Sequence, residues 1–142
     1  MANFISEDDI EKAILNILKE EPFKYDIICC DPSPDKQEDL NDGTGRTNKK
    51  QCVLPQILKT SLQKINPTID KNIIDDIVKD LSRNFGQSDL NFKNYELYQK
   101  IREYIKISIQ KQGKESFDFV KLIDFENPQN NTFTAVSQIW IQ

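Results

Sequence analysis

Two runs rich in β-branched and aromatic residues, 117–125 and 132–140, constrain the fold of this chain more than any other feature. Side chains of these kinds favour β-strands, because they pack well on a pleated surface. The segment between the runs, 126–131, is polar and contains Asn127 followed by Pro128, which break regular structure. It contains no glycine, so a longer loop is expected rather than a two-residue hairpin. This part of the chain is therefore predicted to form a strand, a loop and a second strand.

The residues before these runs are predicted to form four helices. Ser6 can cap a helix over residues 6–20, whose first turn carries acidic residues that suit the positive end of the helix dipole. Apolar residues at helical spacing predict further helices over 53–65, from Asp70 onward, and over 91–102. The residues predicted to form the apolar face of the first helix are Ile10, Ala13, Ile14, Ile17 and Leu18.

A polar segment over about residues 31–50 lacks any periodicity and is predicted to be a long loop. Before it, residues 25–30 form a short apolar run that could be a strand or an extended segment. From residue 103 onward apolar and polar residues alternate, which predicts a strand with one buried face. The isoleucines of that face are Ile105, Ile107 and Ile109. We therefore predict a single α+β domain over residues 1–142, in which N-terminal helices precede a largely antiparallel β-meander.

The composition excludes several kinds of function. The chain has 19 basic and 23 acidic residues, a net charge of -4, which argues against a protein that coats DNA non-specifically. It has no histidine, so histidine-dependent catalytic triads and zinc sites are excluded as they are usually built. Its three cysteines make a poor disulfide framework, which fits a reducing compartment. No apolar run approaches the ~20 residues of a membrane span and the N-terminus lacks a signal-peptide pattern, so we expect a cytoplasmic protein without membrane contact.

Three separated segments of the chain match one known protein family in the same order. The matching residues of the last segment are Ile123, Asp124, Phe125, Asn127, Pro128, Asn131, Thr132, Phe133 and Gln138. The two earlier segments are residues 7–18 and 61–67. Together they resemble the N-terminal domain of the restriction (R) subunit of type I restriction-modification enzymes.

This resemblance implies the first half of a PD-(D/E)XK nuclease-like domain, whose metal-dependent site holds an Asp, a Glu and a Lys. In the family, the strand after Gln138 leads to that Asp and then to Glu-x-Lys, which do not occur before this sequence stops at Gln142. We therefore expect the sequence to be a truncated piece that binds no cofactor and is inactive alone. By resemblance, the full-length subunit uses Mg²⁺ and ATP to cleave unmodified foreign double-stranded DNA and to translocate along it. It would act with methylation (M) and specificity (S) subunits.

Two candidate site residues lie outside the missing motif. By resemblance, Glu11 matches a glutamate that an early helix adds to the metal site, and it shares a helical stripe with Leu15 and Leu18. The alternative, which we favour for an acid in a first turn, is a solvated carboxylate stabilised by the helix dipole. Gln138 lies in the last predicted strand and could reach toward the same site, although a structural role in an alternating strand is preferred.

Three further groups of residues have a functional and a structural interpretation. A small basic cluster, Arg46, Lys49 and Lys50, could contact a DNA backbone, but acidic residues before it favour a solvated loop. Asp124 ends a predicted strand and could bind a metal, but the family places its catalytic Asp later, so a turn or capping role is preferred. The aromatic residues that could stack on bases, or fill a core as we favour, are Phe92, Tyr95, Tyr98 and Tyr104.

Two classes of function follow from these observations. The first is part of an enzyme, the N-terminal portion of the nuclease domain of an R subunit. The second is a non-catalytic module that binds DNA or another subunit. Binding that weakens steeply with salt would indicate phosphate contacts, whereas salt-insensitive association with a protein would indicate docking.

Overall fold

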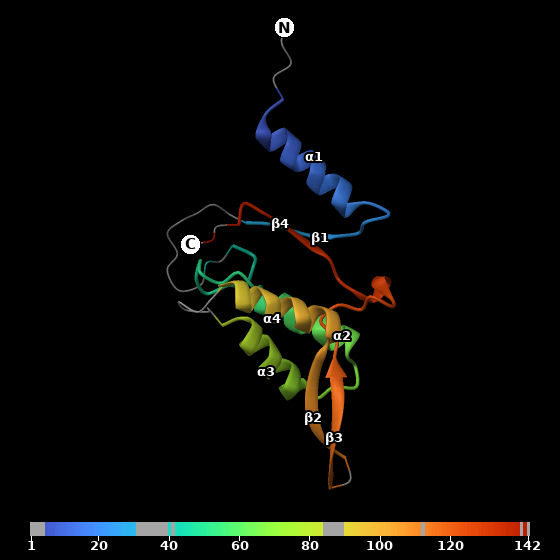
Figure 1. Cartoon of the computed structure of the whole chain (residues 1–142). Helices are drawn as coiled ribbons and strands as arrows, with labels where there is room; N and C mark the ends of the chain where they lie inside the picture. The colour runs from blue at the N-terminus through green and yellow to red at the C-terminus, as the bar shows by residue number, and fades with distance from the viewer. Residues whose placement is uncertain are drawn as a thin grey trace. The chain divides into compact units, whose positions relative to one another are not determined.

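The computed structural model describes residues 5–30, 40, 42–83, 90–111, 113–139 and 141 (Figure 1). The chain divides into two compact units: unit 1 comprises Met1–Leu54 and Thr132–Gln142, and unit 2 comprises Pro55–Asn131. Helices and small sheets both occur, so the predicted α+β class is confirmed. Within the described ranges, every helix is too short or too polar to cross a membrane.

Unit 1 consists of helix α1 (Glu7–Lys19) and two strands, β1 (Asp26–Cys29) and β4 (Thr134–Ser137), which pair with each other (Figure 1). Ser6 begins the helix with a capping box. Its hydroxyl accepts a hydrogen bond from the amide of Asp9 at 3.2 Å, and the Asp9 carboxylate accepts one from the amide of Ser6 at 3.1 Å. The helix predicted at this end of the chain is therefore confirmed.

The pairing of β4 with β1 corrects the predicted meander. The two strands run parallel, with Ile28 opposite Val136, so β4 does not pair with the strand that precedes it in the sequence. Just before the two strands, the rings of Tyr25 and Phe133 stack with their centroids 5.3 Å apart, which aligns the strand starts. Alternation in the sequence shows that a segment is a strand, but it does not show which distant strand will be its partner.

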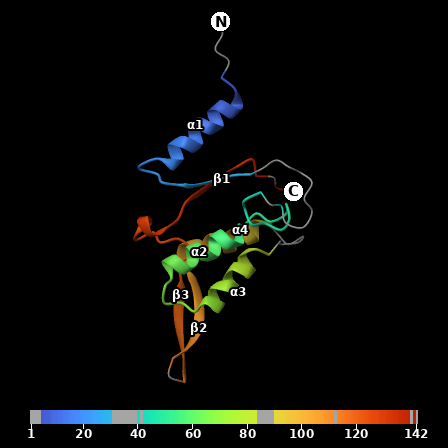
Figure 2. The same cartoon turned by 180° about the vertical axis from the view of Figure 1, so that it is seen from behind.

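Unit 2 contains helices α2, α3 and α4, followed by an antiparallel hairpin of strands β2 and β3 (Figures 1 and 2). Their bounds are α2 Pro55–Ile65, α3 Lys71–Leu81, α4 Leu90–Glu103, β2 Ile105–Lys111 and β3 Lys114–Val120. Asp70 caps α3 by accepting a hydrogen bond from the amide of Asn72 at 2.7 Å. The three helices and the strand from residue 105 lie where the sequence predicted them.

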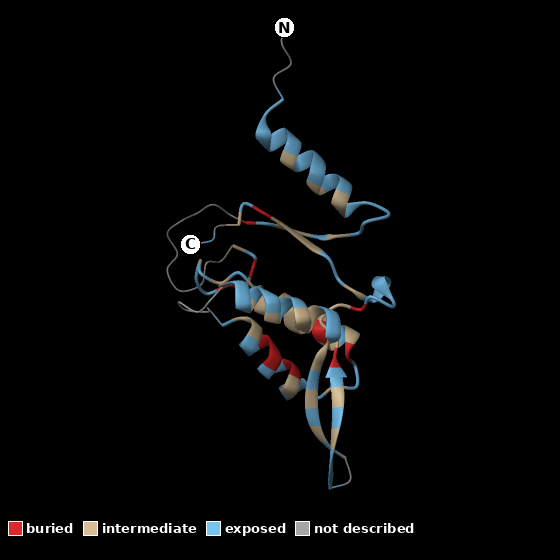
Figure 3. Ribbon diagram, in the orientation of Figure 1, coloured by how far each residue is buried: buried red, intermediate tan, exposed pale blue. Residues whose placement is uncertain are grey.

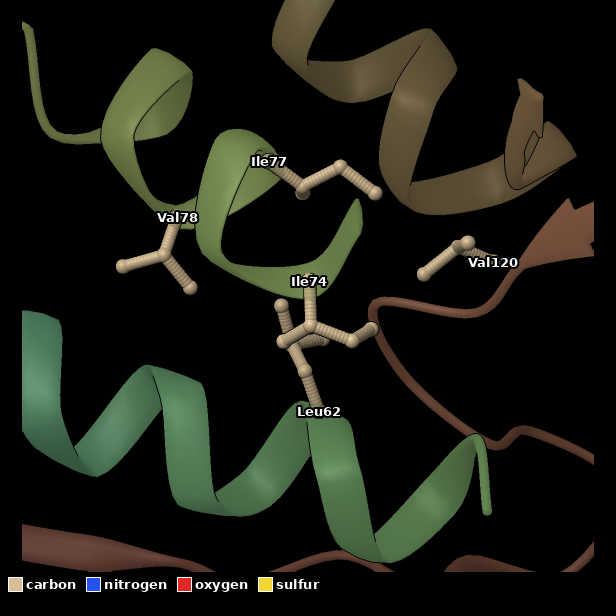
Figure 4. Close-up of a cluster of buried hydrophobic side chains, with 5 residues drawn as sticks. All are labelled: Leu62, Ile74, Ile77, Val78 and Val120. Atoms are coloured by element: carbon tan, nitrogen blue, oxygen red, sulfur yellow. The ribbon is translucent and has the colours of Figure 1, made fainter. Parts of the chain in front are cut away.

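The core of unit 2 lies between α2, α3 and the hairpin. Its buried side chains are Leu62, Ile74, Ile77, Val78 and Val120, which Figure 4 shows in close-up. Ile105 and Ile107 of β2 are half-buried and pack against this cluster, which confirms the predicted buried face of that strand. Most of the buried apolar side chains among the described residues therefore lie in unit 2.

The strand predicted over residues 117–125 ends early, at Val120, because a side chain takes the place of the next strand partner. The Asn66 side-chain amide donates to the carbonyl of Lys121 at 2.9 Å and accepts from its amide at 2.8 Å. It also donates to the carbonyl of Leu62 at 2.9 Å, which ties the end of α2 to the end of β3. Asn66 is buried, so these hydrogen bonds are protected from water.

Replacing Asn66 by Ala is expected to lower the free energy of unfolding by about 2 kcal/mol, because the half-buried amide and carbonyl of Lys121 lose their partner. Urea unfolding followed by circular dichroism measures this change. The matched control is Asn94→Ala, on the exposed surface of α4, which is expected to change stability by no more than about 0.5 kcal/mol. Equal effects of the two variants would contradict the structural role of Asn66.

Three aromatic residues of α4 lie on the surface, and their predicted place in a core is wrong. Phe92, Tyr95 and Tyr98 are 57%, 60% and 50% exposed. The ribbon of α4 is coloured exposed or intermediate in Figure 3. Among the described residues, the buried cluster of unit 2 includes none from α4. Tyr104, just after the helix, is half-buried beneath the ammonium group of Lys121. Helical spacing predicted the helix correctly, but it did not show that this aromatic face would be exposed.

Candidate functional site

The structure brings together the two candidate site residues that the sequence singled out. The side-chain Nε2 of Gln138 donates a hydrogen bond to Oε2 of Glu11 at 2.9 Å, although 127 residues separate them in the chain. Glu11 lies on α1, and Gln138 is the residue immediately after β4. Because α1 contacts both strands of unit 1, the fold of this unit places the carboxylate beside the end of β4.

The position of Glu11 follows from the face of α1 that lies against the strands. Glu11, Leu15 and Leu18 are half-buried, as expected for residues that share one helical stripe. The adjacent apolar stripe is exposed, which corrects most of the predicted buried face of this helix (Figure 3). Its residues are Ile10, Ile14 and Ile17. Glu11 therefore lies at the edge of the contact with the strands, with a hydrogen-bond partner.

The backbone at Gln138 turns the side chain toward α1. Gln138 has a φ of 58°, in the left-handed region that side-chain-bearing residues rarely adopt. It does not continue the alternation of β4, which ends at Ser137, so its predicted place within the strand is corrected. Such a conformation costs on the order of 1 kcal/mol and needs support from the surrounding structure. The hydrogen bond to Glu11 is part of that support.

The segment over residues 42–51 folds around a buried ion pair. The guanidinium of Arg46 is buried and contacts an Asp42 carboxylate oxygen at 3.1 Å. It also donates to the hydroxyl of Thr44 and to the carbonyl of Gln51, both at 3.1 Å. These bonds come from three different nitrogens, which only a guanidinium can provide.

Burial removes Arg46 from the basic cluster that could contact DNA, and it also corrects the solvated loop that we favoured for this residue. The residue is only 1% exposed, and its side chain could not reach a phosphate without leaving its ion pair. Lys49 is half-buried and Lys50 is exposed, and their contact with DNA stays a prediction. This difference could not be predicted from the sequence, because a buried and a solvated arginine look alike in a polar loop.

Acid is expected to weaken unit 1 through Asp42. Burial alone would raise the pKa of Asp42, but hydrogen bonds from Thr44 and Arg46 outweigh it and lower the pKa below its ordinary value of 3.8. Because the pKa is lower in the folded state than in the unfolded state, the ionised Asp42 stabilises the fold at any pH above its unfolded pKa. This stabilisation is lost as the pH falls through the pKa of the folded state. Thermal unfolding between pH 6 and pH 3 tests this. The Asp42→Asn variant should lose less stability in that interval than the parent chain.

Asp124 forms a turn, as preferred from the sequence. Its carboxylate accepts hydrogen bonds from the amide of Asn127 at 3.1 Å and from the side chain of Asn130 at 3.0 Å. Its own amide donates to the side chain of Asn131 at 2.8 Å. The hydrogen bond from Asn130 is the main reason that the pKa of Asp124 is lowered. Several residues that carry the family resemblance thus build this loop.

The described residues do not make a complete metal site. In these parts of the chain, no group of three or more Asp, Glu, Cys or His side chains is placed to hold a metal ion. Mg²⁺ prefers six oxygen ligands, several of which are usually water. Glu11 could provide one such oxygen, so the remaining protein ligands would have to come from elsewhere.

Comparisons with known proteins agree on one family. The profile described as Type I restriction enzyme R protein N terminus matches residues 4–142. The chain is 26% identical, over 139 residues, to the type I restriction enzyme HindI endonuclease subunit of Haemophilus influenzae, covering 97% of this chain and 12% of that protein. It is 26% identical, over 103 residues, to a protein of Methanocaldococcus jannaschii provisionally named type I restriction enzyme MjaIXP endonuclease subunit, covering 70% of this chain and 10% of that protein. No solved structure matches the chain.

Proposed function

The chain belongs to the family of type I restriction enzyme R protein N termini, and from this premise we propose that it forms the first part of a nuclease domain. It spans only 12% and 10% of the length of the two relatives, so the activity proposed is that of a longer R subunit. That subunit would cleave unmodified foreign double-stranded DNA and translocate along it with ATP. The names of both relatives, which are endonuclease subunits, support this proposal.

The observation that carries the proposal is the hydrogen bond between Glu11 and Gln138. It places a carboxylate from α1 at the end of β4, where by resemblance the chain leads on to the Asp and the Glu-x-Lys of a nuclease site. Glu11 would contribute negative charge and one oxygen to that site, and Gln138 would hold its carboxylate in one orientation. The core acidic and lysine residues would follow residue 142.

The cofactors and partners proposed belong to the full-length subunit. Mg²⁺ would serve DNA cleavage, where it activates water and stabilises charge on phosphate. ATP would serve translocation. Apart from the one oxygen that Glu11 would give to the Mg²⁺ site of the longer subunit, neither is proposed to bind these 142 residues. Methylation and specificity subunits would be the protein partners, and a cytoplasmic location would give the complex access to foreign DNA.

The proposal is tested by comparing the 142-residue chain with the full-length subunit in the presence of its M and S subunits. Linearisation of an unmethylated plasmid with Mg²⁺ and ATP is expected for the full-length complex only. Cleavage by the 142-residue chain alone, or none by a folded full-length complex that hydrolyses ATP, would contradict it.

A second candidate function, docking of a partner protein, is favoured by the exposed face of α4. Tyr95 and Tyr98 lie on it beside Arg102, whose guanidinium is 5.5 Å from the centroid of the Tyr98 ring. Tyrosine and arginine are enriched among residues that dominate protein interfaces. Replacing both tyrosines by Ser should then weaken binding of the M and S subunits at least tenfold, with little dependence on salt. Unchanged binding would remove this candidate.

A further inference from the structure

The most deeply buried charge among the described residues, that of Arg46, is not one of the groups assigned above to the proposed nuclease site. Arg46 is 1% exposed and lies in unit 1, where the buried residues among those that the structure describes are mostly polar. They are Cys30, Thr44, Arg46 and Ser137. Burying a charged group is unfavourable unless it is paired and hydrogen-bonded, so a buried arginine in a small unit calls for a reason.

The segment that holds Arg46 packs against the end of β1. A Cβ atom placed on Gly43, which has a φ of 82°, would lie 3.3 Å from Cγ2 of Ile28. Gly43 lies next to Asp42, the ion-pair partner of Arg46. Burial, and to a smaller extent the Asp42 carboxylate, raises the pKa of the Cys30 thiol, just past the end of β1. The ion pair is thus built against the carboxyl end of this strand.

The end of β1 is hydrogen-bonded to Ser137, the residue that precedes Gln138. The amide of Cys30 donates a hydrogen bond to the carbonyl of Ser137 at 3.1 Å, which closes the parallel pairing where Cys29 lies opposite Ser137. The next residue, Gln138, makes the left-handed turn and donates to Glu11. A continuous set of contacts therefore joins the buried ion pair to the Glu11 carboxylate, and every member lies within unit 1.

We propose that the buried Asp42–Arg46 ion pair is a positioning element for the proposed nuclease site, with Arg46 as a positioning residue. It fixes the carboxyl ends of β1 and β4, so that Gln138 can keep its unfavourable backbone conformation and orient Glu11. This inference rests on the proposed function for its catalytic consequence, but its structural part can be tested independently. It assigns Arg46 a role inside the fold, in place of the solvated loop that was favoured from the sequence and of the DNA contact that was its alternative.

A positioning role depends on the shape of the guanidinium as well as on its charge. Arg46 uses three nitrogens to reach Asp42, Thr44 and Gln51 at once. A lysine keeps the charge but has one nitrogen on a flexible stem, so it cannot hold all three groups in one plane. Arg46→Lys is therefore the informative variant, since it changes the geometry while keeping the positive charge.

The first experiment follows the hydrogen-bond chain in the 142-residue protein by nuclear magnetic resonance. In Arg46→Lys, hydrogen exchange of the Cys30 amide should become at least tenfold faster, and the side-chain amide signals of Gln138 should move toward solvent-exposed values. The matched control is Asn66→Ala, which removes buried hydrogen bonds in unit 2 and should leave both Gln138 signals in place. If Arg46→Lys leaves the Cys30 exchange rate and the Gln138 signals unchanged, or if Asn66→Ala alters them equally, the positioning proposal is overturned.

The second experiment measures plasmid cleavage by the full-length subunit, at a temperature where the variants Arg46→Lys and Glu11→Gln are both folded. Arg46→Lys should lower the cleavage rate about tenfold, which is the size of effect seen when residues that orient a catalytic site are changed, while ATP hydrolysis stays unchanged. If Glu11→Gln is also without effect on cleavage, the proposed function of the Glu11 site fails. If Glu11→Gln slows cleavage and Arg46→Lys does not, only the positioning role of Arg46 fails.

Discussion

Replacing Glu11 by Gln in the full-length subunit should lower the rate of DNA cleavage about 100-fold, an effect in the range seen when a partner of a catalytic metal site is removed. The reason is electrostatic, since the substitution removes one negative charge while keeping the size of the side chain. The Gln138 amide can still donate to the oxygen of a glutamine at this position, so the fold of unit 1 should persist. Plasmid linearisation measures the cleavage rate, and ATP hydrolysis serves as the control for folding.

The matched control for this prediction is Glu7→Gln, which makes the same change of charge on the same helix. Glu7 is exposed in the first turn of α1 and can act on the helix only through its dipole. If Glu11 had only that dipole role, the two variants would behave alike. A normal cleavage rate for Glu11→Gln, or equal losses for both variants, would contradict a role of Glu11 in the nuclease site.

Replacing Asp42 by Ala should lower the free energy of unfolding by about 3–5 kcal/mol, because it leaves the guanidinium of Arg46 charged and buried without its carboxylate. For a chain of this size such a loss lowers the melting temperature by on the order of 10 °C. Thermal unfolding at neutral pH measures it. The loss should be largest in unit 1, so hydrogen exchange should accelerate at β1 and β4 before it does so in the core around Leu62.

A double variant separates the cost of leaving the Arg46 charge unpaired from the loss of its contact with Asp42. The double variant Asp42→Ala with Arg46→Met removes both charges and should recover most of the lost stability, since apolar replacements of buried ion pairs are often neutral. The variant Asp80→Ala is a suitable control, because its ion pairs with Lys100 and Arg83 are exposed and should contribute less than about 1 kcal/mol. A double variant less stable than Asp42→Ala would contradict this account.

The helices and one strand could be predicted because their signals are local. Ser6 and Asp70 cap helices by contacts with residues two or three positions away, and alternation from Ile105 marks a strand with one buried face. Periodicity also placed Glu11 correctly on a stripe with Leu15 and Leu18. Such features depend on a few neighbouring residues, so they survive in any fold that contains the helix or strand.

The errors concern contacts between residues that are far apart in the chain. The parallel pairing of β1 with β4 joins segments more than 100 residues apart, and alternation carries no information about it. The early end of β3 depends on Asn66, 55 residues before Lys121. Similarly, the aromatic residues of α4 are exposed and lie outside the buried cluster of the described part of unit 2, which helical spacing cannot reveal.

In the candidate site too, local features could be predicted from the sequence and long-range contacts could not. The resemblance to R subunits pointed to Glu11 and Gln138 separately, but their hydrogen bond requires α1 and β4 to meet, which only the fold of unit 1 provides. The left-handed backbone at Gln138 was not predictable, because glutamine has no preference for that conformation. For Arg46 the sequence suggested the opposite of what is found, since a polar loop ordinarily keeps its charged side chains in water.

The most direct test of the central claim is a double-mutant cycle between Glu11 and Gln138, measured as the rate of plasmid cleavage by the full-length subunit. If the two residues act as one unit, Gln138→Ala should slow cleavage about tenfold. Adding it to Glu11→Gln should then slow the reaction no further, because the carboxylate that Gln138 orients is already absent. Multiplicative losses in the double variant, or a Gln138→Ala variant that cleaves DNA at the normal rate, would contradict the claim that this contact belongs to the nuclease site.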